Sequence, residues 1–582
     1  MSPLTFNIIR QSTQLSAARR GTIAMSQTQT TSEKKGKDSV IDAPGSNAAV
    51  PSKRVMETPG CFMYSVKGSV PHFTPDTLRL QGFGGVNVSI EHILQDHQPI
   101  GLDKWPFTLS KFLNLQDFIL LCDIRDSSRY SKVPFNSDRY VSMVTYQGVR
   151  QLTLEEYLKI VRVYEPDIVA AFADSISDLD HTELGKLTGP DPGSKRVRKS
   201  VDRSLKWLDQ ILKERQGFDT VAEERTKEAE AKKSRKKKQE VVKGDAAVEQ
   251  IEKDTKALEL NSTAVEAKPT LKPWNGVSVF AHVVGAQNEQ ERIRSAQETA
   301  KRQEVDGFII DTNTLLGSKD EVLNLLKVSL DHLPKEKPRL VYGMQTPEDV
   351  LKSIALGADL FDTAYPFQLT EDGKASLYSF GASSSPSSSG IDHNASDGLK
   401  KRWINLWDEE HQDKFVPLLE DCECYACKGG RHTRAFINHL LKAHEMLATV
   451  LLMSHNMHQY NKFFGSVRQS IQDGTFEQHS TSFVKAFGTE PERTGEIHPA
   501  QAIVEAALSK RNRLDGEEDD TEAINAAAIA AELKKKEKEQ MREARRTKVK
   551  EDGLRRQAEM KKKKQQEEGK EAQEVEGSTE KP

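Results

Sequence analysis

Three cysteines stand close together late in the chain, and several histidines follow them. The cysteines are Cys422, Cys424 and Cys427, and the sequence contains only two others, Cys61 and Cys122. Thiolates packed this closely repel one another unless a cation lies between them, so the pattern predicts a tetrahedral Zn²⁺ site made by three cysteines and one histidine. A disulfide or redox site fits less well, because the cysteine count is odd and the two remaining cysteines are remote singletons.

The residues alone leave the fourth ligand open. From Thr433 onward the apolar residues recur every three or four positions, as in an amphipathic helix. Finger-like spacing favours His439. One straight helix would carry His455 roughly 30 Å from the cysteines, so His455 could bind only if the chain reverses near Ala443–Glu445. The histidines available are His432, His439, His444, His455 and His458.

The composition indicates substantial disorder. Charged residues make up 29% of the 582 residues and hydrophobic residues only 36%, which is low for a globular protein. We expect a disordered Ser/Thr/Gln-rich leader at 1–55, a disordered charged insertion at 217–270 and a Ser-rich linker at 381–398. A charged tail at 510–582 is expected to be disordered or a lone helix.

Short apolar segments alternate with amphipathic ones through the middle of the chain. This alternation predicts an α/β fold with a parallel sheet and right-handed crossovers. Its repetition favours a (β/α)₈ barrel of the TIM type, with a doubly wound sheet as the alternative. The barrel would comprise 56–216 and 271–380, followed by a zinc-binding helical subdomain with closing helices at 399–509. The predicted strands are 167–172, 277–284, 307–311, 339–342 and 359–363, and the predicted helices are 195–216, 289–302, 319–333 and 346–356.

Charge and hydropathy give little direct information about partners. The net charge of −3 is no overall signature of nucleic-acid binding, and no apolar run is long enough to predict a membrane span. The first 32 residues lack Asp and Glu but contain Arg10, Arg19 and Arg20, as mitochondrial presequences do. A plain disordered leader is the alternative, and Met25 is an alternative start.

The cysteine-containing segment resembles the zinc subdomain of the tRNA-guanine transglycosylase family. Residues 422–471 share with it the CxCxxC pattern, a TRA(Y/F)IxHL helix and a second helix with an HN pair, here His455-Asn456. The resemblance implies Cys422, Cys424, Cys427 and His455 as ligands of one Zn²⁺ per subunit. An apparent two-residue insertion at Gly429–Arg431 lengthens the spacing between the cysteines and the histidine.

The barrel region resembles the same family at 68–78 (GSVPHFTPDTL) and at 340–366, which contains GADLFD. Family members that exchange a base in tRNA use one Asp to attack the ribose C1′ and a second Asp as general acid/base. Asp362 matches the attacking position and is a vestigial catalytic candidate. The alternative is that Asp362 only caps a strand end or the following turn.

The rest of the family's catalytic constellation is missing. The DSGGFQ loop has no counterpart at 121–128, and the purine-reading Asp falls on Ala173. No glutamine stands at 281–285, the GGLAVGE loop is replaced at 309–315, and the PTR-type arginine is replaced at 366–368. A lone nucleophile without its base or purine clamp loses proton transfer and orientation, each worth on the order of 10²-fold or more in rate.

Residues 195–205 and 291–302 resemble the non-catalytic subunits of this family in eukaryotes. The resemblance implies a heterodimer in which a catalytic queuine tRNA-ribosyltransferase subunit exchanges guanine for queuine at the wobble position of GUN-anticodon tRNAs, and this chain supports it. It implies a cytoplasmic location, with peripheral association with the mitochondrial outer membrane as a further expectation. The alternatives are a self-sufficient transglycosylase that uses Asp362, and a structural zinc adaptor at mitochondria.

Several basic segments are candidate contacts for tRNA phosphates, with solvated surface charge as the alternative. Lys232–Lys238 and the charged tail are the first two. Basic side chains beside the cysteines form the third group, which consists of Lys428, Arg431, Arg434 and Lys442.

Overall fold

The computed structural model describes the chain from Pro3 to Gly488, apart from 13–15, 27–52, 95–107, 129–135, 146–147, 177–179, 182–186, 189–192, 218–273, 275, 316–317, 345 and 382–398. The segments predicted at 217–270, 381–398 and 510–582 therefore lie almost entirely outside the described residues. The chain divides into two compact units. Of the second unit, the structure describes only residues 439–445.

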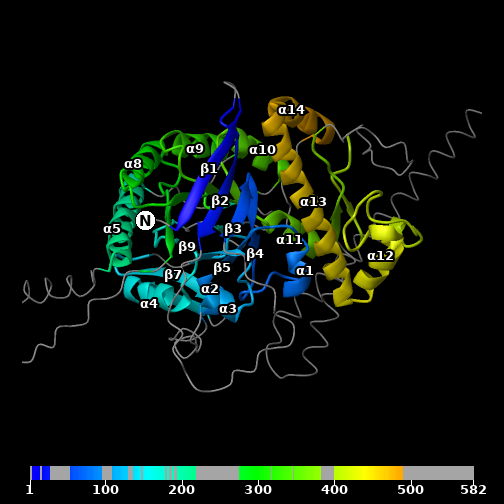
Figure 1. The fold of residues 1–582 in the computed structure, drawn as a ribbon, viewed down its shortest axis with the longest axis horizontal. Coiled ribbons are helices and arrows are strands. Elements are labelled where there is room, and N and C mark those ends of the chain that lie inside the picture. The colour runs from blue at the N-terminus through cyan, green and yellow to red at the C-terminus, as the bar shows by residue number, and fades with distance from the viewer. Residues whose placement is uncertain are drawn as a thin grey trace, which may run out of the picture. The chain divides into compact units, whose positions relative to one another are not determined.

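Eight parallel strands close into a barrel, in the order β12-β13-β14-β15-β4-β5-β6-β9 (Figure 1). The prediction of a (β/α)₈ barrel is confirmed, and the doubly wound alternative is wrong because β15 pairs with β4 and leaves no sheet edge. The barrel strands are β4 Gly60–Tyr64, β5 Gly85–Ser89, β6 Ile119–Asp123, β9 Ile168–Ala170, β12 Ser278–His282, β13 Gly307–Asp311, β14 Arg339–Tyr342 and β15 Leu360–Asp362.

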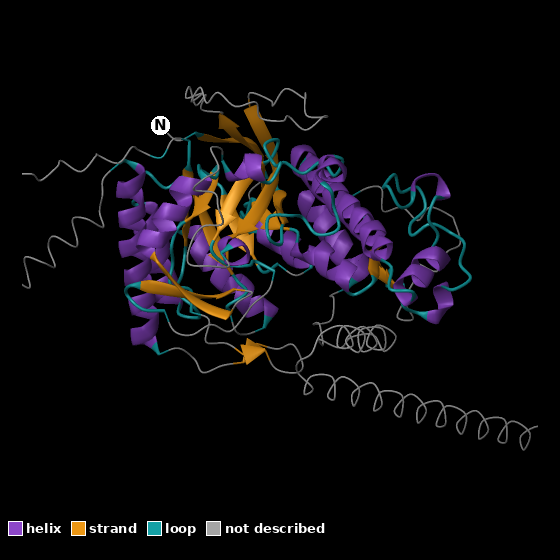
Figure 2. Ribbon diagram, turned by 90° about the horizontal axis from the view of Figure 1, so that it is seen from below, coloured by secondary structure: helices purple, strands orange, loops and turns teal. Residues whose placement is uncertain are grey.

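Helices surround the barrel (Figures 1 and 2). Several follow a polar residue whose side chain accepts a backbone N–H from the first turn, as Thr153 does for α4 and Ser318 does for α9. Among the described residues, no helix is both long and apolar enough for a membrane span. The helices of the barrel region are α1 Pro75–Arg79, α2 Ile90–Ile93, α3 Leu109–Phe112, α4 Leu154–Tyr164, α5 Ser194–Arg215, α8 Glu289–Ala300, α9 Lys319–Asp331, α10 Pro347–Ala355 and α11 Ala364–Glu371.

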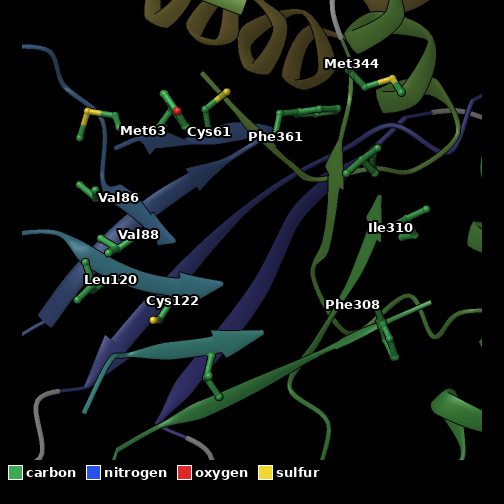
Figure 3. Close-up of a cluster of buried hydrophobic side chains, with 14 of the residues drawn as sticks. Cys61, Met63, Val86, Val88, Leu120, Cys122, Phe308, Ile310, Met344 and Phe361 are labelled. Carbon is green, nitrogen blue, oxygen red and sulfur yellow. The ribbon is translucent and has the colours of Figure 1, made fainter. Parts of the chain in front are cut away.

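Alternation along the barrel strands creates two layers of core. Side chains such as Cys61, Met63 and Leu120 point outward and pack beneath the helices (Figure 3). Their neighbours, such as Phe62 and Leu121, point into the barrel. The interior has room for Phe62 because β5 begins at Gly85, where a Cβ atom would lie 2.6 Å from the Phe62 ring.

A three-stranded antiparallel sheet closes one end of the barrel. Its strands are β1 Leu4–Gln11, β2 Arg19–Ser26 and β3 Lys53–Thr58, and Ile23, Met25 and Met56 reach the barrel's interior core. The prediction that 1–55 is a disordered leader is therefore wrong for β1 and β2. Residues 1–55 are mostly polar, but β2 contains a few apolar side chains that are buried against the barrel strands.

Arg19 fastens this sheet to the barrel. It is only 2% exposed, and its Nε and Nη2 atoms each donate to the Asp359 carboxylate at 2.6 Å. The Arg19 guanidinium also donates to the backbone oxygens of Lys335 and Lys337. A residue that gave the segment its presequence-like composition is therefore part of the folded core.

The remaining elements extend the barrel or form the subdomain that carries the cysteines. α12 ends at Lys442, His444 adopts a left-handed φ of 58°, and α13 begins at Met446, so the chain forms two helices at the place where binding by His455 requires it. The remaining strands are the hairpin β7 Tyr140–Thr145 and β8 Gly148–Thr153, and the pairs β10 Asp180–His181 with β11 Leu187–Thr188 and β16 Lys374–Ser376 with β17 Trp403–Asn405. The remaining helical elements are the 3₁₀ turns η2 Glu409–His411 and η3 Lys428–Gly430, and the helices α12 Arg434–Lys442, α13 Met446–Asp473 and α14 Phe476–Phe487.

Candidate metal centre and barrel pocket

The structure brings Cys422, Cys424, Cys427 and His455 together in one buried cluster. The Nδ1 atom of His455 lies 3.7, 3.5 and 3.4 Å from the three sulfurs in chain order. Zn–S bonds of about 2.3 Å and Zn–N bonds of about 2.0–2.1 Å at tetrahedral angles place sulfur and nitrogen about 3.5–3.6 Å apart. The distances between the nitrogen and the three sulfurs therefore fit a tetrahedral ion.

Surrounding groups orient these side chains. The Nε2 atom of His455 lies 2.8 Å from the backbone oxygen of Ser376, so Nε2 carries the proton and Nδ1 presents its lone pair to the sulfurs. Gln459 Nε2 donates to Cys422 Sγ at 3.1 Å, and the Cys427 amide donates to Cys424 Sγ at 3.3 Å. Such outer partners are typical of metal sites, where they hold each ligand in position.

Asn456 joins the helix of the candidate ligand His455 to the barrel. Its Oδ1 atom accepts from the amide and hydroxyl of Ser376 at 2.9 and 3.0 Å, and its Nδ2 atom donates to Thr370 Oγ1 and the Lys374 oxygen. His455 and Asn456 therefore both bind the short strand β16. The HN pair thus orients the candidate metal ligand and attaches α13 with adjacent side chains.

The loop after the cysteines turns on two glycines. Gly429 and Gly430 have φ values of 67° and 66°, a conformation that L side chains rarely adopt. The Lys428 amide donates to the Cys424 oxygen and the Gly430 amide to the Cys427 oxygen, which forms the 3₁₀ turn η3. The apparent insertion is therefore accommodated in a compact turn next to the ligand atoms.

The other histidines and the basic side chains lie elsewhere. The described cluster does not include His439, and the His432 ring instead stacks on Phe436 at 5.7 Å. Lys428, Arg431 and Lys442 are exposed. The prediction of a phosphate contact is wrong for Arg434, because this side chain is buried and donates to the backbone oxygens of Pro417 and Leu418.

A second candidate site lies at the carboxyl ends of the barrel strands, where barrel enzymes bind substrate. It is a cavity with an empty volume of about 410 Å³, including space open to solvent. Its polar lining comes from the strands β6, β12, β13 and β14 and from the segments after β6 and β9. The lining residues are Asp123, Ile124, Arg125, Asp126, Ser127, Val141, Ala173, Ser175, His282, Asp311 and Tyr342.

Asp362 is buried at the end of β15, beside this cavity. Burial raises its pKa from 3.8 to about 7, and the neighbouring carboxylates of Asp126 and Asp311 act in the same direction. The Ala364 amide donates to its Oδ1 atom at 3.0 Å. The protonated fraction of this carboxyl group cannot attack a ribose carbon, because the ionised form is the nucleophile.

The loop after β6 fills part of the cavity with its own side chains. Arg125 and Asp126 line the cavity in the region where the family pattern has the two glycines of DSGGFQ. Arg125 donates to the Ser142 oxygen at 3.1 Å, and Asp126 accepts from Tyr64 Oη at 2.8 Å and lies 3.0 Å from His92 Nε2. Burial opposes ionisation of Asp126, but the hydrogen bonds to His92 and Tyr64 lower its pKa.

Sequence reasoning missed this arrangement because it treated the loop as having no counterpart. Aspartates at the ends of β6 and β13 were the available signal, since consecutive parallel strands bring their carboxyl ends to one face of the barrel. Asp123 lies 3.8 Å from His282 Nε2, and burial raises the pKa of Asp311. The site thus gathers several carboxyl groups around a space where the family reads a purine.

The segment at 195–205 contacts the loop after β9 through buried side chains. Asp174 is buried and accepts from two arginines of this helix, with Arg196 at 2.8 and 3.1 Å and with Arg203. Asn136 Nδ2 donates to the same carboxylate at 2.7 Å. This network fixes the loop after β9, where Ala173 replaces the purine-reading residue.

Comparison with known proteins agrees with this geometry. The family model described as queuine tRNA-ribosyltransferase matches residues 45–234 and 238–489. Similar curated proteins are named queuine tRNA-ribosyltransferase accessory subunit 2. The protein from Xenopus tropicalis is 29% identical over 450 residues, which cover 74% of this chain and 92% of that protein. The one from Danio rerio is 30% identical over 438 residues (72% and 89%), and the human one is 29% identical over 448 residues (73% and 91%). The barrel, the Cys₃His cluster and these matches together show that the chain belongs to the queuine tRNA-ribosyltransferase, or tRNA-guanine transglycosylase, family.

Proposed function

We propose that this protein is the non-catalytic subunit of a heterodimeric tRNA-guanine transglycosylase. In this role it supports a catalytic subunit that exchanges guanine for queuine at the wobble position of GUN-anticodon tRNAs. The observation that carries the proposal is the obstructed, acidic pocket. Arg125 and Asp126 occupy space that two glycines leave open in the family pattern, and burial keeps Asp362 partly protonated.

The lining of the pocket supports a non-catalytic role. Asp123, Asp126 and Asp311 line the cavity together with Arg125, and Asp362 lies next to them. Ala173 stands at the position of the family's purine-reading aspartate, and no glutamine stands at 281–285. This barrel is therefore poorly suited to hold a purine with its ribose C1′ next to Asp362.

We assign one Zn²⁺ per subunit to Cys422, Cys424, Cys427 and His455. When bound, the ion supplies structural cross-linking, because four protein ligands leave no open position for a reacting water. The four residues tie the segment before α12 to α13, and Asn456 ties α13 to the barrel. Metal binding in a small element of this kind contributes directly to its folding free energy.

An exposed aromatic patch next to the cysteines is a suitable docking surface for the catalytic subunit. We define the patch as Phe415, Tyr425, His432 and Phe436. Phe415 is 78% exposed, Tyr425 55% and Phe436 39%, and the His432 ring lies 6.0 Å from Tyr425 and stacks on Phe436. Exposed apolar groups gathered in one place are typical of protein interfaces, where aromatic side chains dominate binding energy.

Contacts with tRNA are proposed for the start of α5. Lys195, Arg198 and Lys199 are exposed there, and the first turn of the helix contains no acidic residue. Cationic side chains that neutralise phosphates release counterions, so such binding weakens steeply with salt.

We also propose a cytoplasmic location with peripheral mitochondrial association, because cleavage of a presequence would remove the strands that close the barrel.

The decisive experiment assays incorporation of labelled base into tRNA by this chain, by the catalytic subunit, and by the mixture. We expect no exchange by this chain alone and full activity only in the mixture. Asp362→Asn in this chain should leave the activity of the mixture unchanged. A covalent tRNA adduct on the isolated chain that Asp362→Asn abolishes would instead support a self-sufficient transglycosylase.

The aromatic patch has its own test. Tyr425→Ser with Phe436→Ser should abolish co-elution with the catalytic subunit on gel filtration. Phe112→Ser is the matched control, because Phe112 is a 50% exposed aromatic residue on α3 and lies outside the patch. Co-elution that survives the double substitution would place the interface elsewhere.

Normal queuine content in tRNA after deletion of the gene would favour a structural zinc adaptor.

A further inference from the structure

A second cluster of potential metal ligands lies in the segment that leads to the cysteines. It consists of Asp408, Glu410 and His411, around the 3₁₀ turn η2. One ligand atom from each residue lies within 4.8 Å of the other two. None of these residues belongs to the Cys₃His centre, and the proposed function gives them no role.

The local backbone explains why these side chains converge. Asp408 is the residue that precedes η2, and its oxygen accepts from the His411 amide at 3.2 Å. In a 3₁₀ turn, side chains three positions apart lie directly above one another, so Asp408 and His411 share one face. Glu410 is next to them, with its Oε1 atom 3.6 Å from His411 Nε2.

The imidazole of His411 is the second observation that points to a ligand. Its side chain is only 1% exposed, and neither Nδ1 nor Nε2 has a hydrogen-bond partner among the described residues. A buried polar group without a partner costs free energy, and native structures rarely leave both nitrogens of a histidine in that state. The two carboxylates stand where a cation bound to this imidazole would need them.

We propose that Asp408, Glu410 and His411 form a second Zn²⁺ site, distinct from the Cys₃His centre. One imidazole nitrogen and two carboxylate oxygens, completed by water, form a ligand set that suits borderline divalent cations. With metal–ligand bonds of about 2.1 Å at tetrahedral angles, two ligands of one ion lie about 3.4 Å apart. Glu410 Oε1 and His411 Nε2, at 3.6 Å, are already close to that separation, and the cluster as a whole lies within 4.8 Å.

Nearby cations make this site weaker than the thiolate site. Lys414 Nζ lies 3.8 Å from Glu410 Oε2, so a bound ion competes with Lys414 for that carboxylate. The Arg434 guanidinium is also close, but it donates to the oxygens of Pro417 and Leu418. Zinc should therefore fill the Cys₃His centre first and this site second.

The bound ion would brace the base of α12. Asn438 Nδ2 donates to the oxygens of Leu406 and Asp408 at 2.8 and 3.1 Å. An ion held by Asp408 and His411 fixes the same turn from its other side. The second site would thus stabilise the run of chain that delivers Cys422 to the first centre.

The test measures zinc bound to the full-length chain after equilibration with excess Zn²⁺ and dialysis. Wild-type protein should hold two equivalents, and Glu410→Gln and His411→Phe should each hold one. Glu409→Gln is the matched control, because Glu409 is an exposed neighbour on the same turn and outside the cluster, and it should hold two. In a chelator competition, Glu410→Gln should weaken the second equivalent by more than the 10–100-fold that loss of an outer partner costs.

Substitution with Co²⁺ separates the two centres. The sulfur-to-cobalt charge-transfer absorption should stay unchanged in Glu410→Gln and His411→Phe, since it reports only the Cys₃His centre. One zinc equivalent in the wild type, or two in Glu410→Gln, would overturn the proposal. Because Glu410 is 51% exposed, its substitution tests the site even if His411→Phe fails to fold.

Discussion

Replacing Asp362 by asparagine should stabilise the barrel, and the gain should grow with pH. The side chain is buried among other carboxyl groups, and its pKa is raised from 3.8 to about 7. As pH rises between these two values, Asp362 ionises in the unfolded chain but stays protonated in the folded one. This ionisation stabilises the unfolded state, so stability falls between about pH 4 and pH 7 and is not regained above. Asparagine cannot ionise, so the variant does not lose this stability as pH rises.

The two pKa values fix the magnitude. The difference in ionisation destabilises the folded protein by about 2 kcal/mol at pH 5 and by about 4 kcal/mol at pH 8. Any fixed effect of the changed side chain is the same at both pH values and cancels in the comparison. The stabilisation by Asp362→Asn should therefore be larger at pH 8 than at pH 5 by about 2 to 3 kcal/mol.

The assay is denaturant unfolding of both proteins at the two pH values. Asp413→Asn is the control, since Asp413 is exposed and should show no such dependence. An equal effect of Asp362→Asn at both pH values would mean that Asp362 is fully ionised at neutral pH. The carboxylate would then be available as a nucleophile, and the argument for a disarmed pocket would fail.

Three further predictions concern the candidate metal centre and the ends of the barrel. Gln459→Leu removes the hydrogen bond to Cys422 Sγ and should weaken zinc binding by about 10–100-fold in a chelator competition; an unchanged affinity would exclude this supporting role. Arg19→Met leaves Asp359 buried without its partner and should cost about 3–5 kcal/mol in denaturant unfolding, whereas a loss below about 1 kcal/mol would show that the pair does not hold the sheet. Asn456→Ala removes four hydrogen bonds between α13 and its neighbours and should cost at least about 3 kcal/mol; thermal unfolding at the wild-type temperature would contradict it.

The barrel elements were predictable because their patterns are local. Strands 307–311 and 339–342 match β13 and β14, and the predicted helices agree with the structure within about two residues at each end. Buried parallel strands are short continuous apolar runs, and the helices between them are amphipathic. Neither signal depends on what the element packs against.

The strands at the N-terminus and the pocket depend on distant partners. Arg19 looks like a charge in a polar leader until Asp359, 340 residues later, places it in the core. Arg434 looks like a basic residue on a helix surface until the oxygens of Pro417 and Leu418 accept from it. The spacing of the cysteines is enough to predict that they form one site. Choosing between His439 and His455 as the fourth ligand requires knowing where the first helix ends, which the residues do not show.

The closing sheet also bears on how the protein is made. Ser12 Oγ donates at 2.6 Å to Glu477 Oε1 of α14, a contact between residues 465 positions apart. At a ribosomal rate of 5–20 residues per second, the first strand waits roughly 20–90 s for that partner to be synthesised. During this interval the apolar side chains of β2 have no complete barrel to cover, and exposed apolar surface is prone to aggregate. Nascent copies of this protein should therefore rely on chaperones until translation is nearly complete.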